Sequence, residues 1–263
     1  MARFFLVLGR FWALLVVVFL LAPIFVTVAV SLSPSAVFDF PVERLSTRWY
    51  ERLARQSSFW EALGTSAWIA SVSTLLAVAL ATPAAIAIAT RAIPGSRTLA
   101  GLLTSPLMMP GLVVGIAFLQ AFRAVGLRDA QTCLVIAHVI ITLPYIVRTL
   151  LASLHLFDFS LIDAARTLGS TWPGAVAKVL LPALFPAVVT GSAFAFLASF
   201  DNYSISLFLV DVTARTLPIQ VLNYLETGAD PTIAAISTIL LCFTVLALLL
   251  ADRIVGVRRL DLG

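Results

Sequence analysis

Charged residues are scarce in this sequence: Asp, Glu, Lys and Arg together make up 11% of its 263 residues. Soluble domains carry about 25% charged and about 45–50% apolar residues. Here the hydrophobic fraction is 61% and the mean hydropathy is +1.06. So few charges cannot cover a surface that faces water, which excludes a soluble domain and indicates that lipid is the solvent. The length fits one membrane domain.

Several signatures of chemistry are missing as well. The two cysteines, Cys133 and Cys242, lie within apolar runs and lack the spacing of metal ligands, so we expect no metal site. No G-x-x-x-x-G-K-S/T motif occurs, so we do not expect the chain itself to bind the phosphates of ATP. The basic residues are scattered, which argues against nucleic acid as a partner. His138 and Asp201 alone do not make a catalytic site, so no catalytic residues are assigned.

Six apolar runs between charged residues are long enough to cross a bilayer, which takes about 20 residues in a helix. Open sheets leave backbone groups unpaired in lipid, so helices are expected. The predicted spans are 11–31, 62–90, 98–122, 130–147, 179–200 and 231–251. We expect the fifth to continue a few residues past Asp201. The predicted fold class is therefore an all-α membrane protein with six transmembrane helices.

Two of these spans have features of their own. The first, 11–31, is longer than the about 7–15 apolar residues of a cleaved signal peptide, so we expect it to stay as a helix. The third contains the run 105–111, in which Pro106, Pro110 and Gly111 interrupt the apolar sequence. This run is either a packing position or a flexible corner near a translocation path, and packing is the favoured interpretation.

The distribution of basic residues predicts the orientation, because Lys and Arg are in excess on the cytoplasmic side of membrane proteins. With the N-terminus inside, ten of the seventeen basic residues fall on the cytoplasmic side and seven on the outer side. Four of the outer arginines lie in the loop 33–60, whose role stays open between contact with a soluble binding protein and a position at the membrane interface. We therefore predict both termini in the cytoplasm.

One cytoplasmic segment, between Arg148 and Lys178, has the pattern of two short helices. Asp158 or Ser160 can cap the first helix, and Gly169 is suited to end it. The second is expected to begin near Ser170 or Thr171, with Pro173 in its first turn. The apolar side of the first helix is predicted to include four residues, Leu161, Ile162, Ala165 and Leu168. An amphipathic loop on the membrane surface is the simpler alternative.

The spacing in this segment resembles the coupling loop of the binding-protein-dependent ABC permeases. That loop reads Glu-Ala-Ala, three residues, Gly, nine residues, then Ile-x-Leu-Pro. The chain matches it with Asp163-Ala164-Ala165, Gly169 and Val179-Leu180-Leu181-Pro182 at the same spacings. It departs by Asp for Glu at 163 and by Val for Ile at 179. The resemblance covers roughly residues 60 to 255.

The resemblance implies a type I ABC importer permease in the bacterial inner membrane. It divides the chain into an N-terminal helix and outer loop (1–60), a core with the coupling loop 154–182 (61–255) and a short basic tail (256–263). The implied partners are a dimeric ATPase that binds ATP and magnesium, a second, non-identical permease subunit and an extracytoplasmic solute-binding protein. The residues implied to contact the ATPase are Asp163, Ala164, Ala165, Arg166 and Gly169.

The candidate residues of the substrate path are Asp201, Asn202 and Tyr203, since an acid in a span normally faces a cavity or a partner. The alternatives for Asp201 are a structural pair and a place at the outer water interface. The stretches 105–115, 199–208, 216–218 and 230–238 resemble the second permease subunit of spermidine/putrescine importers. Many of those carry a second acid where this chain has Asn202, so an amino-acid-like compound, a phosphonate, thiamine or iron stays open as the solute.

Three other classes of protein are alternatives: a secondary transporter, a membrane enzyme and a purely structural subunit that forms one half of a heterodimer. Secondary transporters often contain inverted repeats and broken helices at the midplane, and no clear repeat is found in this sequence. A coupling loop also has no role in a carrier driven by ion gradients. A membrane enzyme would need clustered acids, histidines or a nucleophile with its base. The ABC importer permease is therefore the preferred prediction.

Overall fold

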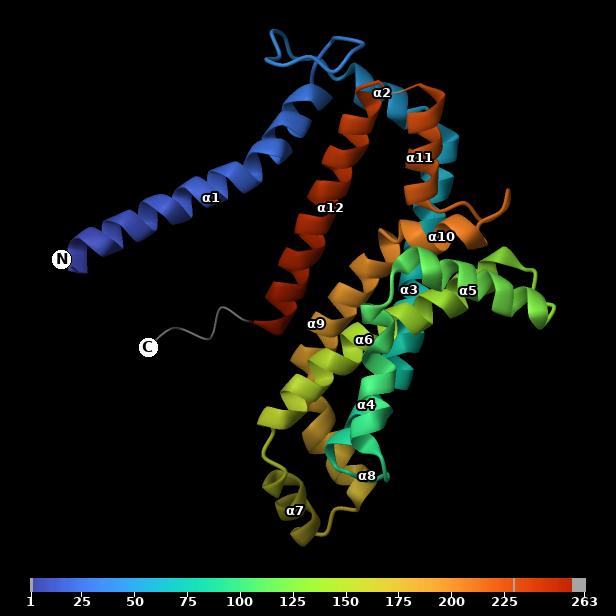
Figure 1. Ribbon diagram of the computed structural model, residues 1–263. Coiled ribbons are helices and arrows are strands. Elements are labelled where there is room, and N and C mark those ends of the chain that lie inside the picture. The colour runs from blue at the N-terminus through green and yellow to red at the C-terminus, as the bar shows by residue number, and fades with distance from the viewer. Residues whose placement is uncertain (1, 229, 257–263) are drawn as a thin grey trace. The chain divides into compact units, whose positions relative to one another are not determined.

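The computed structural model describes residues 2–228 and 230–256, and every regular element in these two ranges is a helix (Figure 1). The predicted basic tail, 256–263, lies outside the described residues except for Gly256. The helices in the first half are α1 (Ala2–Ser31), α2 (Arg48–Ala54), α3 (Ser57–Ala89), α4 (Ser96–Thr104), the 3₁₀ helix η1 (Ser105–Met108) and α5 (Gly111–Ala124). Those in the second half are α6 (Ala130–Leu156), α7 (Ser160–Thr167), α8 (Trp172–Ala175), the π segment η2 (Val176–Leu180), α9 (Leu181–Phe200), α10 (Tyr203–Leu209), α11 (Leu217–Thr227) and α12 (Thr232–Val255).

Five of the helical stretches are long and apolar enough to cross a membrane. They are Leu8–Ser31, Ser57–Ala89, Ala130–Leu156, Trp172–Phe200 and Thr232–Ile254. A helix makes its backbone hydrogen bonds internally, so it can present apolar side chains to lipid at no cost in unpaired polar groups. The all-α fold is thus confirmed. The fourth span is longer than predicted and passes Arg148 as far as Leu156, because a long basic side chain at a helix surface can extend its charge toward water.

The third predicted span, 98–122, is not one helix. Ser96–Met108 and Gly111–Ala124 meet at an angle of 107°, so the span is broken. Met109 is extended, at φ −95° and ψ 141°, as expected for a residue whose helical conformation clashes with a following proline. Pro110 has no N–H to donate and stands directly before the first residue of α5. The corner interpretation of the run 105–111 therefore describes it better than simple packing, and the described chain has six spans when this bent pair is counted as one.

The fifth span also differs from its prediction. It begins earlier, at Trp172, and runs through the π segment Val176–Leu180 into α9. It ends at Phe200, and the expected continuation past Asp201 is wrong. The chain turns there because the Asn202 side chain accepts a hydrogen bond from the Ile205 backbone N–H (3.0 Å) and starts a new helix, α10.

The chain forms two compact units, each described here by itself. The larger comprises Trp60–Gln220 and the segment from Val245, and its centre is the pair α6 and α9, which run side by side (Figure 1). Gly191 of α9 lies so close to α6 that a Cβ at this position would be 3.2 Å from the Ile146 Cα. Small residues of this kind allow the close backbone approach on which helix association in lipid depends.

The smaller unit comprises the segments up to Phe59 and Val221–Thr244. The Trp49 indole of α2 is buried and donates to the Ser33 backbone carbonyl (2.8 Å), and the Arg48 guanidinium lies 4.2 Å from the centre of its ring. Asp230 receives Arg52 Nη1 at 2.7 Å, the Tyr224 hydroxyl at 3.1 Å and the Thr232 backbone N–H at 2.9 Å. This carboxylate therefore ties α2 and α11 to the beginning of α12.

Replacing Asp230 with asparagine is expected to lower the stability of the smaller unit. Asparagine keeps an acceptor for the Thr232 N–H but removes the charge-assisted bond to Arg52, and a hydrogen bond to a charged group contributes about 1.5–3 kcal/mol. Thermal unfolding of the purified chain should begin several degrees lower. Glu226→Gln, which removes an exposed carboxylate from the neighbouring helix α11, is the matched control and should leave the transition unchanged. Equal transitions for both variants would contradict a stabilising role of Asp230.

Candidate functional site

The segment that resembles a coupling loop forms a helix, a glycine corner and a second short helix. The helix α7 ends in a Schellman motif: the Ser170 N–H donates to the Ala165 carbonyl (3.1 Å), and the Gly169 N–H donates to the Arg166 carbonyl (3.0 Å). Gly169 has φ +91°, a conformation that residues with a side chain rarely adopt. The predicted corner is present, and it is made by the local sequence alone.

Both short helices have a side-chain hydrogen bond at their beginning: from the N-cap residue Thr171 in α8, and from Asp158, the residue before the N-cap, in α7. The Asp158 carboxylate accepts from the Ser160 backbone N–H (3.0 Å), and the bonds from Ser160 hold the pKa of this acid below its ordinary value. The Thr171 hydroxyl accepts from the Gly174 N–H (3.3 Å), with Pro173 in the first turn of α8 as predicted. A negative charge at the start of α7 is favourable for the helix dipole, so the caps stabilise the corner from both sides.

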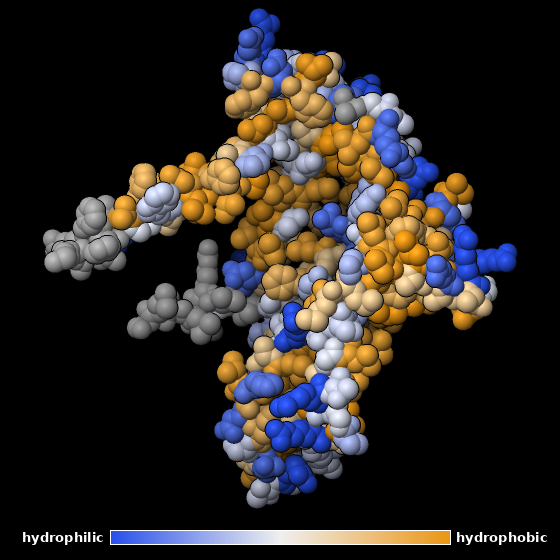
Figure 2. Space-filling view, in the orientation of Figure 1, coloured by the Kyte–Doolittle hydropathy of each residue, from blue (hydrophilic) through white to orange (hydrophobic). Residues whose placement is uncertain are grey.

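The exposed side of α7 carries most of the residues assigned to the ATPase contact. Asp163, Ala164 and Arg166 are exposed, whereas Ala165 is half-buried against the core beside the buried Ile162. The prediction that Leu161 and Leu168 share the apolar side with Ile162 is wrong, since both are exposed, Leu168 to 89%. The reason is that α7 is short and rests on the bundle through one narrow stripe, so only Ile162 and Ala165 reach it. In Figure 2, hydrophilic residues gather at this end of the larger unit.

The residues predicted for the substrate path lie at the break between α9 and α10. Asp201 is exposed, and its carboxylate makes no hydrogen bond or ion pair within residues 2–228 and 230–256. Asn202 is half-buried and is occupied in capping α10. Tyr203 begins α10 and is 37% exposed. Of the three, Asp201 and Tyr203 have exposed polar groups without a hydrogen bond in the described ranges, and Asp201 is the one with a charge.

The break in the third span and the turn between α9 and α10 meet at one cavity. It has a volume of about 170 Å³ and is bounded by both breaks, with Met109 from one and Asn202 from the other. Its lining comprises Pro106, Leu107, Met109, Gly111, Val114, Ile141, Tyr145, Ala198, Asn202 and Ile205. Asp201 and Tyr203 do not line it. The tertiary structure therefore brings together Asn202 and the run 105–111, which the sequence left as separate features.

A buried histidine holds the break between α9 and α10 in place. His138 of α6 is hydrogen-bonded through Nδ1 to the Ser199 hydroxyl (2.7 Å) and through Nε2 to the Ser206 hydroxyl (3.3 Å). Ser199 lies at the end of α9 and Ser206 lies within α10, so one imidazole links three helices. His138 is thus hydrogen-bonded to two neighbouring helices, and its partners flank the Asp201–Asn202 turn.

Two glycines that the sequence analysis did not assign to the site fix α5 against α10. A Cβ at Gly111 would lie 2.9 Å from the Ser204 Cβ. A Cβ at Gly115 would lie 2.7 Å from Phe208 Cδ2 and 2.9 Å from the Ser204 carbonyl oxygen. The G-x-x-x-G spacing of 111 and 115 is the signal that could have identified this contact, because it places both glycines on one helix face.

Comparisons with known proteins agree with this architecture. The family described as "Binding-protein-dependent transport system inner membrane component" matches residues 81–257. The spermidine/putrescine transport system permease protein PotC of Haemophilus influenzae is 30% identical over 97% of this chain and 98% of its own length. The putrescine transport system permease protein PotI of Escherichia coli is 32% identical over 74% of this chain and 72% of its own. A bacterial ABC transporter for alginate has a chain with a TM-score of 0.72 at 18% identity, covering 97% of this chain and 96% of that one, which supports the fold.

Proposed function

Because the chain belongs to the family of binding-protein-dependent transport system inner membrane components, we propose that it forms half of a solute path and draws its energy from a separate ATPase. The chain is the permease subunit of an ABC importer and a multi-pass inner-membrane protein. ATP and magnesium belong to the ATPase. The observation that carries the proposal is the capped corner at Gly169, which projects α7 from the end of the bundle.

The exposed side of α7 is suited to docking in a groove of the ATPase. Ala164 offers a surface with no long side chain, so a partner can approach the helix closely. Asp163 and Arg166 flank it with one charge of each sign, and the exposed Leu168 adds apolar area at the corner. Because Ile162 and Ala165 anchor the other side of α7 in the core, a push on this helix would be transmitted to α6 and α9 as a rigid-body movement.

A second permease subunit, non-identical to this one, would complete the path. Apolar side chains next to the break of the third span are left exposed by the described residues: Met108 is 85% exposed, and Leu112, Val113 and Ile116 of α5 are exposed as well. A facing permease would bury this surface and close the open side of the broken span. The extracytoplasmic solute-binding protein would deliver the solute to that shared path.

The orientation follows from the coupling surface. If α7 contacts a cytoplasmic ATPase, then the four spans before it, counting the bent pair as one, place the N-terminus on the same side. The two spans after it place the end of α12 there too. Both termini are then cytoplasmic, in agreement with the excess of basic residues on that side.

The proposed solute is a polyamine or a similar small compound with amino groups. Two relatives similar over most or much of this chain are named as polyamine permeases. The Asp201 carboxylate, which has no partner in the described chain, can attract an ammonium group at the end of α9. An amino-acid-like compound, a phosphonate, thiamine or iron is the alternative solute, and a negatively charged one would be disfavoured by Asp201.

The experiment is solute-dependent ATP hydrolysis in liposomes that contain the chain with its partner permease, its ATPase and its binding protein. Spermidine and putrescine are compared with amino acids, a phosphonate, thiamine and iron. Stimulation by polyamines alone supports the proposed solute. Stimulation by another compound contradicts the solute and leaves the importer in place, whereas hydrolysis that responds to no binding protein contradicts the proposed function.

Asp201→Asn is expected to reduce polyamine uptake about tenfold, because a hydrogen bond to a charged group contributes about 1.5–3 kcal/mol and about 1.4 kcal/mol corresponds to a factor of ten. Asn202→Asp is the matched variant: aspartate caps a helix as well as asparagine does, so α10 is kept and a second acid is added. We expect it to keep or increase uptake. Unchanged uptake in Asp201→Asn would rule out a direct role for this carboxylate.

A further inference from the structure

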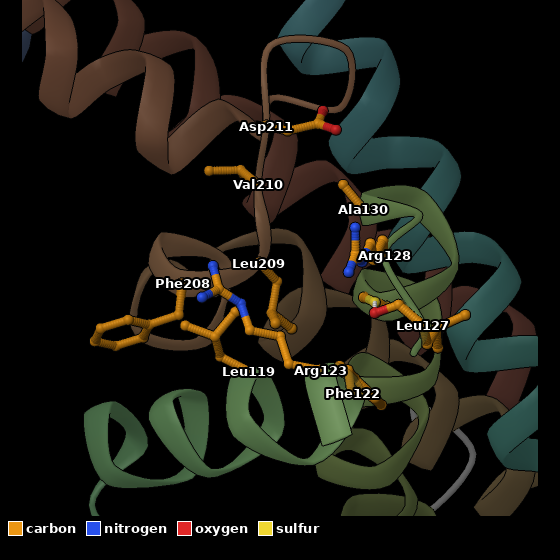
Figure 3. A pocket seen from close by; sticks show the side chains of 11 residues that line it. Leu119, Phe122, Arg123, Leu127, Arg128, Ala130, Phe208, Leu209, Val210 and Asp211 are labelled. Carbon is orange, nitrogen blue, oxygen red and sulfur yellow. Dashed lines mark hydrogen bonds between the residues drawn. The ribbon is translucent and has the colours of Figure 1, made fainter. Parts of the chain in front are cut away.

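A second, larger pocket lies at the C-terminal end of α5, which is the end away from the break at Met109–Pro110 (Figure 3). It has a volume of about 490 Å³ and is formed by the end of α5, the beginning of α6 and the segment that follows α10. Its apolar wall includes Leu119, Phe122, Phe208 and Leu209. Two arginines, Arg123 and Arg128, and one acid, Asp211, also line it. The pocket thus combines a hydrocarbon wall with fixed charges.

The two arginines have no partner of their own. Neither Arg123 nor Arg128 makes a hydrogen bond or ion pair with any residue in the described ranges. In the view of Figure 3 their guanidinium groups lie on either side of Leu209. By contrast, Arg52 is paired with Asp230 at 2.7 Å. An unpaired guanidinium presents donors in a planar fork that matches the oxygens of a phosphate or a carboxylate.

The nearby acids do not neutralise these arginines by contact. Asp211 Oδ1 accepts from the Thr213 N–H (2.8 Å), the Thr213 hydroxyl (2.7 Å) and the Ala214 N–H (2.8 Å), and Oδ2 accepts no hydrogen bond from the residues described. Asp129 accepts from the Thr132 N–H (2.8 Å) and caps α6. Both acids therefore make hydrogen bonds within their own loops. The pocket is left with two positively charged groups and one carboxylate oxygen of Asp211 that accepts no hydrogen bond in the described ranges.

The depth of the pocket in the membrane follows from the two spans that the turn beside it connects. The turn 125–129 joins the bent third span to α6, so it lies where the chain leaves the hydrocarbon and enters the headgroup region. This holds whichever side of the membrane the turn faces. At this depth an amphipathic ligand with a phosphate and an acyl chain is present at high concentration.

We propose that this pocket is a binding site for a phospholipid, whose phosphate is held by Arg123 and Arg128 and whose acyl chain packs on Leu119 and Phe122. Asp211 also lines the pocket. Its negative charge favours a headgroup with an ammonium group, that of phosphatidylethanolamine, over that of phosphatidylglycerol, whose net charge is negative. An acidic segment of a soluble partner protein is the competing occupant. The apolar wall favours lipid, because a carboxylate side chain would leave most of that wall uncovered.

The test is native mass spectrometry of the full chain with its partner subunits, after exchange into micelles that contain equal amounts of phosphatidylethanolamine and phosphatidylglycerol. Wild type is expected to retain about one phospholipid per chain, chiefly phosphatidylethanolamine. Arg123→Gln/Arg128→Gln should reduce this retention at least tenfold. Leu119→Trp, which fills the pocket and leaves both arginines in place, should also reduce it. Arg97→Gln/Arg148→Gln removes two arginines that line none of the pockets described here and should retain the lipid.

Four outcomes would overturn the proposal: no retained lipid in wild type, full retention in the Arg123/Arg128 variant, full retention in Leu119→Trp, or an equal loss in the Arg97/Arg148 control. Affinity for the binding protein is measured on the same samples. A variant that keeps its lipid but loses that affinity identifies the pocket as a protein-docking site instead. Solute-stimulated ATP hydrolysis in wild type reports separately on the proposed function, so the two can fail independently.

Discussion

Replacing Gly169 with alanine is expected to reduce binding-protein-stimulated ATP hydrolysis about tenfold. At φ +91° a Cβ is strained, and the left-handed conformation costs a residue with a side chain about 1–2 kcal/mol. Space is not the obstacle, because no atom lies within 4 Å of the position that the Cβ would take. The strain is relieved when the corner opens, which turns α7 away from the ATPase. Hydrolysis is measured in liposomes with and without the loaded binding protein.

Gly126→Ala is the matched control for this prediction. Gly126 has φ +77° and equally open surroundings, but it lies in the turn between α5 and α6. Both variants should lower the thermal unfolding temperature by a similar amount, and only Gly169→Ala should lose stimulated hydrolysis. If the two variants lose activity in parallel, the effect is one of general strain, and the assignment of the corner to ATPase coupling fails.

Gly115→Val is expected to separate α5 from α10 and to abolish most solute uptake. Its Cβ would lie 2.7 Å from Phe208 Cδ2 and 2.9 Å from the Ser204 carbonyl oxygen, which belongs to the backbone and cannot turn aside. Overpacking of this kind costs about 1–3 kcal/mol, and here it falls on the contact that positions the second break. Because α10 begins at the turn after α9, the cavity between this turn and the broken third span should change shape. Uptake of radiolabelled spermidine and thermal unfolding are measured together.

Gly64→Val controls for placing a β-branched residue in an apolar span. Gly64 lies in α3, and a Cβ there has no atom within 4 Å. We expect its uptake and unfolding temperature to stay close to those of wild type. Normal uptake in Gly115→Val, with an unchanged unfolding temperature, would contradict the prediction. It would show that the close contact between α5 and α10 does not shape the path.

The spans illustrate how far apolar runs predict a membrane fold. Five of the six predicted spans are single helical stretches, because a helix in lipid needs little more than a run of apolar residues of sufficient length. The third is the exception. Pro106 and Pro110 were visible in the sequence, but an apolar run alone cannot tell a kink from a bend of 107°. The angle of the bend depends on the helix against which α5 packs, and this helix is α10.

The coupling corner was determined by the sequence itself. Its parts lie within one short stretch: a capping acid at Asp158, a glycine at 169 and Thr171 with Pro173 at the next helix start. Each acts through bonds to residues a few positions away, so local spacing is sufficient to predict the structure. The side of α7 that faces the core was only partly predicted, because that choice is made by helices distant in sequence.

The cavity and the lipid pocket were decided by tertiary structure alone. Met109 and Asn202 meet across the cavity although they lie far apart in the chain, and the contact that brings them together runs through Gly115 and the α10 backbone. The bonds from His138 to Ser199 and Ser206 join three helices in the same way. Contacts between distant segments leave no local pattern in a sequence. The sequence by itself therefore determined the membrane fold and the helix–glycine–helix corner, while packing between helices determined the cavity and the pocket for which a solute and a lipid are proposed.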